Sequence, residues 1–306
     1  MRLLAIGLAA LALAGFADAP VSDPPPSVAA AAHGHFPHVR RVALLMLENR
    51  SYEQVIGSRR APYLNHLAHR YALSTRFYAE AHPSLPNYVA LTGGSKLGFT
   101  HDCATCATGA PNFVTQLDRA GISWRGYFQS IPATGSPVIR DENYSAHYNP
   151  FTYFDRVRAN PVDRARIVSF ENLQSDIRTR RLARFTWISP DLAHDGHNNS
   201  LASADRYASR LVPGLLRALG PHGLLYVSWD EGRRSDHRGI HGSRGGGRIA
   251  LIAAGGQARR HAVSHRPANQ YALLRSLEAG FGLRTLGQAG AEGTPLLTGL
   301  VKPPLG

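Results

Sequence analysis

One serine in the sequence has neighbours that would hold a nucleophile rigid. Ser84 lies between Pro83 and Pro86 in the stretch AHPSLPNYV, with His82 before the first proline. Prolines restrict the backbone on either side of them, so the hydroxyl of Ser84 would keep a fixed direction. The residues alone also fit a proline-stiffened loop without chemistry, in which His82 bonds nearby backbone. Both interpretations stay open at this point.

A second set of residues able to do chemistry consists of carboxylates. The acids that follow apolar runs of strand length are Glu48, Asp191, Asp195, Asp230 and Glu231. Carboxylates gathered at one place repel one another unless a cation lies among them, so a divalent metal ion is the expected partner. Taken singly, each acid could instead cap the N-terminus of the next helix.

The apolar runs predict the strands that would position these acids. Mostly apolar runs of strand length cover residues 42–47, 185–189, 224–229 and 249–254. Such runs indicate strands buried on both faces, as in a central sheet between two layers of helices. Ligands of open α/β sheets bind beyond the carboxyl ends of the strands, so we expect the acids at one rim of the sheet.

Helical patterns alternate with these strands. The expected helices cover residues 61–72, 112–120, 203–219 and 270–279. Ser203 is the expected N-cap of the third helix, and Pro213 should kink it. The alternation predicts an α/β fold with a mostly parallel central sheet and helices on both faces.

The N-terminal residues have the layout of a secretory signal. Residues 1–19 combine Arg2, an apolar run and a small-residue Ala17-x-Ala19 pattern, which is typical of a signal peptide. Residues 20–37 are rich in proline and alanine and read as a flexible linker. We therefore expect a secreted or periplasmic protein with one domain over residues 38–306 and no transmembrane anchor once the signal is removed.

The two cysteines and the net charge add two further expectations. Cys103 and Cys106 form a Cys-x-x-Cys pattern, which in an exported chain favours a small local disulfide, although redox and metal motifs share the spacing. The formal net charge is +13. The arginines are spread along the chain without interleaved aromatic clusters, so the charge indicates solubility and attraction for anions rather than a dedicated nucleic-acid face.

Four short motifs in this order resemble the bacterial and fungal phosphoesterase family that holds acid phosphatases and phospholipases C. The motifs are ENRS from Glu48, HPSLPNY from His82, DGH from Asp195 and WDEG from Trp229. That family belongs to the alkaline phosphatase superfamily. The resemblance covers about residues 42–286, including YALLRSLEAGFGLRTL, and implies the three-layer architecture of that superfamily.

The resemblance also implies roles for individual residues. It assigns the nucleophile to Ser84, which would become phosphorylated, and a metal site to Ser84 with Glu48, Asn49, Asp230 and Glu231. The residues implied beside the phosphate are Asn87, His147, Asp195 and His197. Oxygen ligands favour Mg²⁺ or Ca²⁺, while a histidine would admit Zn²⁺. The family usually has a histidine where this chain has Gln270, and His265 lies five residues before it.

The expected function is that of an exported, metal-dependent phosphomonoesterase of the acid phosphatase type. Its substrates would be phosphate esters, either broadly or as phosphoinositide and other lipid headgroups. One alternative is a phospholipase C, which would cut a phosphodiester with the same site. Another is an inactive homologue that binds anions or lipids, for which Gln270 is the supporting feature.

Overall fold

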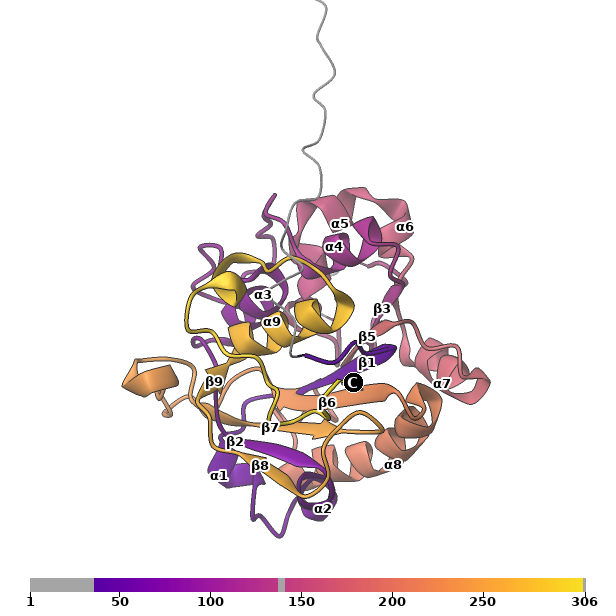
Figure 1. The fold of residues 1–306 in the computed structure, drawn as a ribbon. Helices are drawn as coiled ribbons and strands as arrows, with labels where there is room; N and C mark the ends of the chain where they lie inside the picture. The colour runs from indigo at the N-terminus through magenta and orange to yellow at the C-terminus, as the bar shows by residue number, and fades with distance from the viewer. Residues whose placement is uncertain (1–35, 137–140, 305–306) are drawn as a thin grey trace, which may run out of the picture.

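The fold was determined as a computed structural model, which describes residues 36–136 and 141–304 (Figure 1). The predicted signal peptide at 1–19 lies outside the described residues, as does most of the predicted linker. Phe36 and Pro37 are buried, and Phe36 contacts the position of Gly280, so these two residues already belong to the packed domain. No helix of the described part is both long and apolar enough to cross a membrane.

A nine-stranded sheet forms the centre of the molecule (Figure 1). Its strands are β1 (Arg41–Leu47), β2 (Ala72–Tyr78), β3 (Trp124–Phe128), β4 (Ile167–Val168), β5 (Phe185–Ser189), β6 (Gly223–Trp229), β7 (Arg248–Ala254), β8 (Ala262–Ser264) and β9 (Ala268–Asn269). The order is β4-β3-β5-β1-β6-β7-β2-β8, with β9 paired to β2. Only β7 runs antiparallel to its neighbours among these strands, so the prediction of a mostly parallel sheet is confirmed.

Helices cover both faces of this sheet. They are α1 (Tyr52–Val55), α2 (Pro62–Arg70), α3 (Ser84–Gly93), α4 (Phe113–Arg119), α5 (Asp155–Ala159), α6 (Pro161–Arg164), α7 (Phe170–Thr179), α8 (Leu201–Leu219) and α9 (Gln270–Phe281). Helices α2, α7 and α8 pack side by side on one face, while α3, α4 and α9 lie on the other (Figure 1). The strands between them are almost wholly buried, which is why the sequences of β1 and β6 are mostly apolar.

One local prediction needs correction, and one alternative that the sequence left open can be excluded. Helix α8 begins earlier than expected, because the side chain of Ser200 rather than Ser203 caps it by accepting from the Ser203 amide. The segment around Ser84 is a helix, α3, and not a loop. Its prolines fit because Pro83 is the N-cap and Pro86 lies in the first turn, where backbone amides have no partner within the helix.

The register of the central strands places the site. Leu47 of β1 pairs with Trp229 of β6, so the residues that follow them, Glu48 and Asp230, leave the sheet side by side. The Asp230 amide donates to the Leu47 carbonyl at 3.0 Å, and the Glu48 amide donates to the Asp195 carbonyl at 3.0 Å. The loops after β1, β5 and β6 are thereby joined at one rim of the sheet.

Candidate active site

Two buried carboxylates form the centre of the candidate site. Glu48 is 1% exposed and Asp230 is 0% exposed. Burial, followed by the negative charges of Asp230 and Asp195, holds the pKa of Glu48 well above its usual range. Burial also raises the pKa of Asp230 to about 6. The fold therefore gathers negative charge in a place from which water is excluded.

Helix α3 brings two hydroxyl groups to Glu48. Ser84, the first residue of the helix, donates from its Oγ to Glu48 Oε2 at 3.3 Å. Tyr88 donates its hydroxyl to the other carboxylate oxygen, Oε1. The two residues are four apart, which places them on the same face of the helix. A hydrogen bond from Ser84 also lowers the pKa of Asp230, against the larger effect of burial, so Ser84 lies between both carboxylates.

Asn49 connects the same two carboxylates. Its backbone amide donates to Asp230 Oδ1 and its side-chain Nδ2 donates to Glu48 Oε2, both at 2.9 Å. The φ angle of Asn49 is 55°, in the left-handed region that asparagine tolerates better than most residues. This backbone turn aims the amide at the aspartate.

Glu231 faces a histidine rather than the Glu48 carboxylate. His82 Nδ1 lies 2.7 Å from Glu231 Oε2, and His82 Nε2 lies 2.8 Å from the Asp236 carbonyl oxygen. The expectation that His82 bonds backbone is thus met by one ring nitrogen, but the other binds the glutamate. The bond to Glu231 raises the pKa of His82, and burial raises the pKa of Glu231 to about 7.

The two aspartates after β5 have different surroundings. Asp195 is 0% exposed, and burial raises its pKa to about 7; its Oδ1 accepts from the His197 amide at 2.7 Å. Asp191 instead binds the Ser130 hydroxyl at 2.6 Å and lies 2.9 Å from His194 Nδ1. Asp195 joins the central carboxylates, while Asp191 ties loops together.

The predicted histidines line one pocket next to this centre. His147, in the short 3-10 helix Ala146–Tyr148, and the exposed His197 both line a pocket of about 340 Å³. Asp102 lines the same pocket and accepts from the Leu85 amide of α3 at 2.9 Å. One residue of the pocket lining therefore binds the backbone of the residue that follows Ser84.

Asn87 and Gln270 both support the backbone of the site. The Asn87 amide accepts from the backbone of Glu80 and Ala81 and donates to the carbonyls of Ala81 and Pro83, at 2.9 to 3.0 Å. These four bonds use the full capacity of an amide. Gln270, 1% exposed, donates to the Asp230 carbonyl at 2.7 Å.

His265 lies elsewhere, exposed and bonded to the Thr75 hydroxyl at 2.8 Å. It does not take the place that the resemblance gives to a histidine at position 270.

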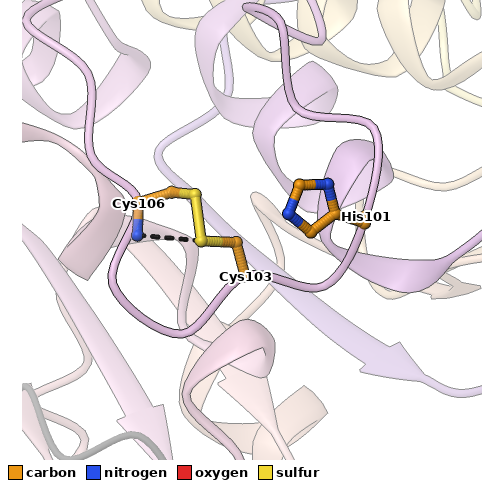
Figure 2. A group of neighbouring side chains, drawn as sticks. All are labelled: His101, Cys103 and Cys106. Atoms are coloured by element: carbon orange, nitrogen blue, oxygen red, sulfur yellow. Dashed lines mark hydrogen bonds between the residues drawn. A yellow bond between two sulfur atoms is a disulfide. The ribbon is translucent and has the colours of Figure 1, made fainter.

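A disulfide closes the short loop that directly follows Asp102. Cys103 and Cys106 are bonded, as expected, and the Cys106 amide donates to Cys103 Sγ at 3.1 Å (Figure 2). His101 lies beside them, and the ligand atoms of the three residues are within 4.8 Å of one another. Thiolates bind metals, but the two sulfur atoms of a disulfide are not thiolates. In its oxidised form this group therefore stabilises the loop covalently and does not form a metal site.

The central carboxylates suit a hard cation better. Asp230 Oδ2 and Asp195 Oδ2 are buried without a hydrogen-bond partner among the described residues. Such atoms carry a desolvation cost that a cation would remove. The ligand atoms at hand on Glu48, Asn49, Ser84 and Asp230 are oxygens, which Mg²⁺ and Ca²⁺ prefer. Glu231 is adjacent, with one oxygen engaged by His82.

The fold is similar to that of several solved structures. The chain is similar to the solved structure of a protein in the alkaline phosphatase superfamily from Vibrio parahaemolyticus, with a TM-score of 0.57 and 14% identity over 84% of this chain and 72% of that one. It is also similar to murine ectonucleotide pyrophosphatase / phosphodiesterase 5, with a TM-score of 0.52 and 11% identity over 82% of this chain and 97% of that one. These likenesses show the fold alone, and they confirm the predicted architecture.

Sequence comparison gives the family. The model of the phosphoesterase family matches residues 58–284. The phosphatidylinositol-3-phosphatase of Mycobacterium tuberculosis is 30% identical over 272 residues, 87% of this chain and 84% of that protein. The phosphate-repressible acid phosphatase of Penicillium chrysogenum is 25% identical over 259 residues, 81% of this chain but 60% of that protein. The chain belongs to the phosphoesterase family and is a hydrolase of phosphoric esters.

Proposed function

We propose that the chain is an exported, metal-dependent phosphomonoesterase in which Ser84 is the nucleophile. The observation that carries the proposal is the position of the Ser84 hydroxyl, 3.3 Å from Glu48 Oε2 at the first residue of a buried helix. The names of the similar proteins, a phosphatidylinositol-3-phosphatase and acid phosphatases, support phosphate monoesters, including phosphoinositide headgroups, as substrates. Residues 1–19 and the disulfide of Cys103 with Cys106 support export.

The positions of Ser84, Glu48 and the two histidines suggest how the phosphate ester is cleaved. Ser84 Oγ attacks phosphorus as its proton passes to the hydrogen-bonded Glu48, and the ester oxygen leaves with a proton. His147 or His197 would supply that proton, because both line the pocket that also contains Asp102, the partner of the Leu85 amide next to Ser84, and imidazole changes charge near neutrality. Water then attacks the phosphoserine while the same histidine takes the proton of the water, and the Ser84 oxygen leaves phosphorus as it regains the proton from Glu48.

A divalent cation, Mg²⁺, Ca²⁺ or Zn²⁺, held by Glu48, Asn49, Ser84, Asp230 and Glu231 would neutralise these carboxylates and lower the pKa of the serine hydroxyl. Asp195 keeps the loop after β5 against Glu48 through its carbonyl. Asn87 holds the turn before Ser84 rather than a phosphoryl oxygen, since its amide is fully bonded to backbone. Gln270 supports the Asp230 carbonyl, so its presence does not argue for an inactive homologue.

The test is hydrolysis of p-nitrophenyl phosphate after chelation and after adding back single metals. We expect chelation to abolish activity, one or more metals to restore it, and Asp230→Ala to prevent restoration. Phosphocholine release from phosphatidylcholine, measured in parallel, reports the phospholipase C alternative. If no metal restores phosphate release to the chelated protein, or if Asp230→Ala responds like the unmodified chain, the proposal is wrong.

A further inference from the structure

A second pocket of the molecule is lined by three arginines. Its volume is about 590 Å³, and its lining includes Arg76, Tyr78, His237, Arg238, Ser243 and Arg244 with two glycines. None of these lining residues is acidic. The pocket is therefore positively charged, and we call it the arginine pocket.

Two of its three arginines have uncompensated charge. Arg238 is paired, because its guanidinium binds Glu53 at 2.8 and 2.9 Å and Asp236 at 2.6 Å. Arg76 and Arg244 are exposed, and within residues 36–136 and 141–304 neither guanidinium makes an ion pair or a hydrogen bond. Two free guanidinium groups on one concave surface favour an anion that can bind both.

The framework that carries Arg244 is packed tightly against the segment before Ser84. The Gly246 amide donates to the Ala79 carbonyl and the Gly245 amide donates to the His237 carbonyl, both at 2.9 Å. A Cβ on Gly246 would lie 2.1 Å from the Ala81 carbonyl oxygen, so only glycine allows this approach. The arginine pocket is thus held in a fixed relation to the start of α3.

A pair of histidines connects the two places. His82, two residues before Ser84, binds Glu231 on one side, and its ring packs edge-on against His237 with 5.3 Å between ring centroids. His237 belongs to the lining of the arginine pocket, and desolvation and the charge of Arg244 lower its pKa. The His82–His237 pair therefore lies between Glu231 and the arginine pocket.

We propose that Arg76, Arg244 and His237 bind a second phosphate group of a substrate whose first phosphate is hydrolysed at Ser84. This inference rests on the proposed function and narrows its substrates to esters that carry two phosphates on a small scaffold. A phosphorylated inositol ring has this chemistry, whether its second phosphate is free or links the ring to a lipid. A substrate with a single phosphate leaves the arginine pocket empty.

The first experiment measures binding and does not require turnover. Isothermal titration of a Ser84→Ala background with myo-inositol 1,3-bisphosphate and with myo-inositol 3-phosphate compares the two ligands. Arg76→Gln and Arg244→Gln should each weaken binding of the bisphosphate about tenfold more than binding of the monophosphate, because each removes a charge-assisted contact. Arg210→Gln, which changes an exposed arginine of α8, is the matched control and should change neither. Equal losses for both ligands, or none, overturn the proposal.

The second experiment measures turnover of three substrates: p-nitrophenyl phosphate, the soluble bisphosphate and short-chain phosphatidylinositol 3-phosphate in micelles. The ratio of kcat/KM between each bisphosphorylated substrate and p-nitrophenyl phosphate should fall about tenfold in Arg76→Gln and Arg244→Gln. The two substitutions could instead weaken only the binding of the protein to phosphatidylserine vesicles. That result would mean that the arginines attract a charged surface, and it would overturn the proposal. If no substrate is hydrolysed, the proposed function fails, while the titration still decides whether the arginine pocket binds a second phosphate.

Discussion

Glu48 is the residue on which the other side chains of the site converge. Its two carboxylate oxygens accept from the Ser84 and Tyr88 hydroxyls, and Asn49 donates to it as well. Because Glu48 is 1% exposed, water cannot replace a bond that is lost. The direction of the Ser84 hydroxyl therefore also depends on Tyr88 and Asn49, which hold the Glu48 carboxylate in place.

Replacing Tyr88 with phenylalanine should destabilise the protein. The change leaves Glu48 Oε1 buried without its donor, which costs about 1–3 kcal/mol. Tyr226→Phe is the matched control, because the Tyr226 hydroxyl is buried and has no partner in the described part of the chain. It should be neutral or stabilising. Urea unfolding in the presence of a chelator measures both, and equal effects of the two substitutions would contradict the account.

The sequence indicated the carboxylates of the candidate site better than it indicated their hydrogen-bond partners. Glu48 and Asp230 could be predicted because each directly follows an apolar run that only a buried strand explains. Tyr88 and the contact of His82 with Glu231 could not, because both require the helix at Ser84. Once α3 is known to be a helix, the spacing of four residues from Ser84 to Tyr88 is the signal that would have found the tyrosine.

At the scale of elements, α9 is anchored at both ends by buried polar groups. Gln270 at its start donates to the Asp230 carbonyl, and Glu278 near its end accepts from the Leu286 amide at 2.8 Å. Glu278 is 0% exposed, its Oε2 has no partner among the described residues, and burial raises its pKa to about 9 despite the charge of Arg275. The folded state thus holds this proton far more tightly than the unfolded chain.

The free energy of unfolding should therefore decrease as the pH rises, because Glu278 must lose its proton when the chain unfolds. The contribution of the protonated carboxyl is complete below the unfolded pKa of about 4.3 and decreases by up to about 1.4 kcal/mol per pH unit above it. The loss continues until the pH passes the folded pKa of about 9. Urea unfolding at pH 5, 7 and 9 should show a weaker pH dependence for Glu278→Gln than for the unmodified chain or for the exposed control Glu292→Gln. Parallel curves for all three proteins would argue against this assignment.

Elements differed in how well the sequence predicted them. The strands β1, β5, β6 and β7 were predicted because they lie in the middle of the sheet and are apolar on both faces. The sequence could not show that β7 runs antiparallel, since burial is the same in either direction. Strand β2 and helix α3 were missed because β2 mixes polar and apolar residues and α3 begins between prolines.

The molecule as a whole is positively charged, while several of its carboxylates are buried together in the candidate site. Lys and Arg number 34 against 21 Asp and Glu, and the buried carboxylates of the site lie within a chain of net charge +13. A positive molecule attracts phosphate esters from a distance, while its central acids need a cation before an anion can approach them. The arginine pocket places some of this positive charge next to the His82–His237 pair, whose His82 binds Glu231.

Trapping the phosphorylated intermediate tests whether Ser84 is the nucleophile. The metal-loaded protein is mixed with substrate, quenched in acid within one turnover and digested, and the phosphorylated peptides are sequenced by mass spectrometry. We expect phosphate on Ser84, absent in Ser84→Ala and unchanged in the control Ser209→Ala on α8. Full hydrolytic activity in Ser84→Ala, or phosphate trapped on another residue, would contradict this expectation.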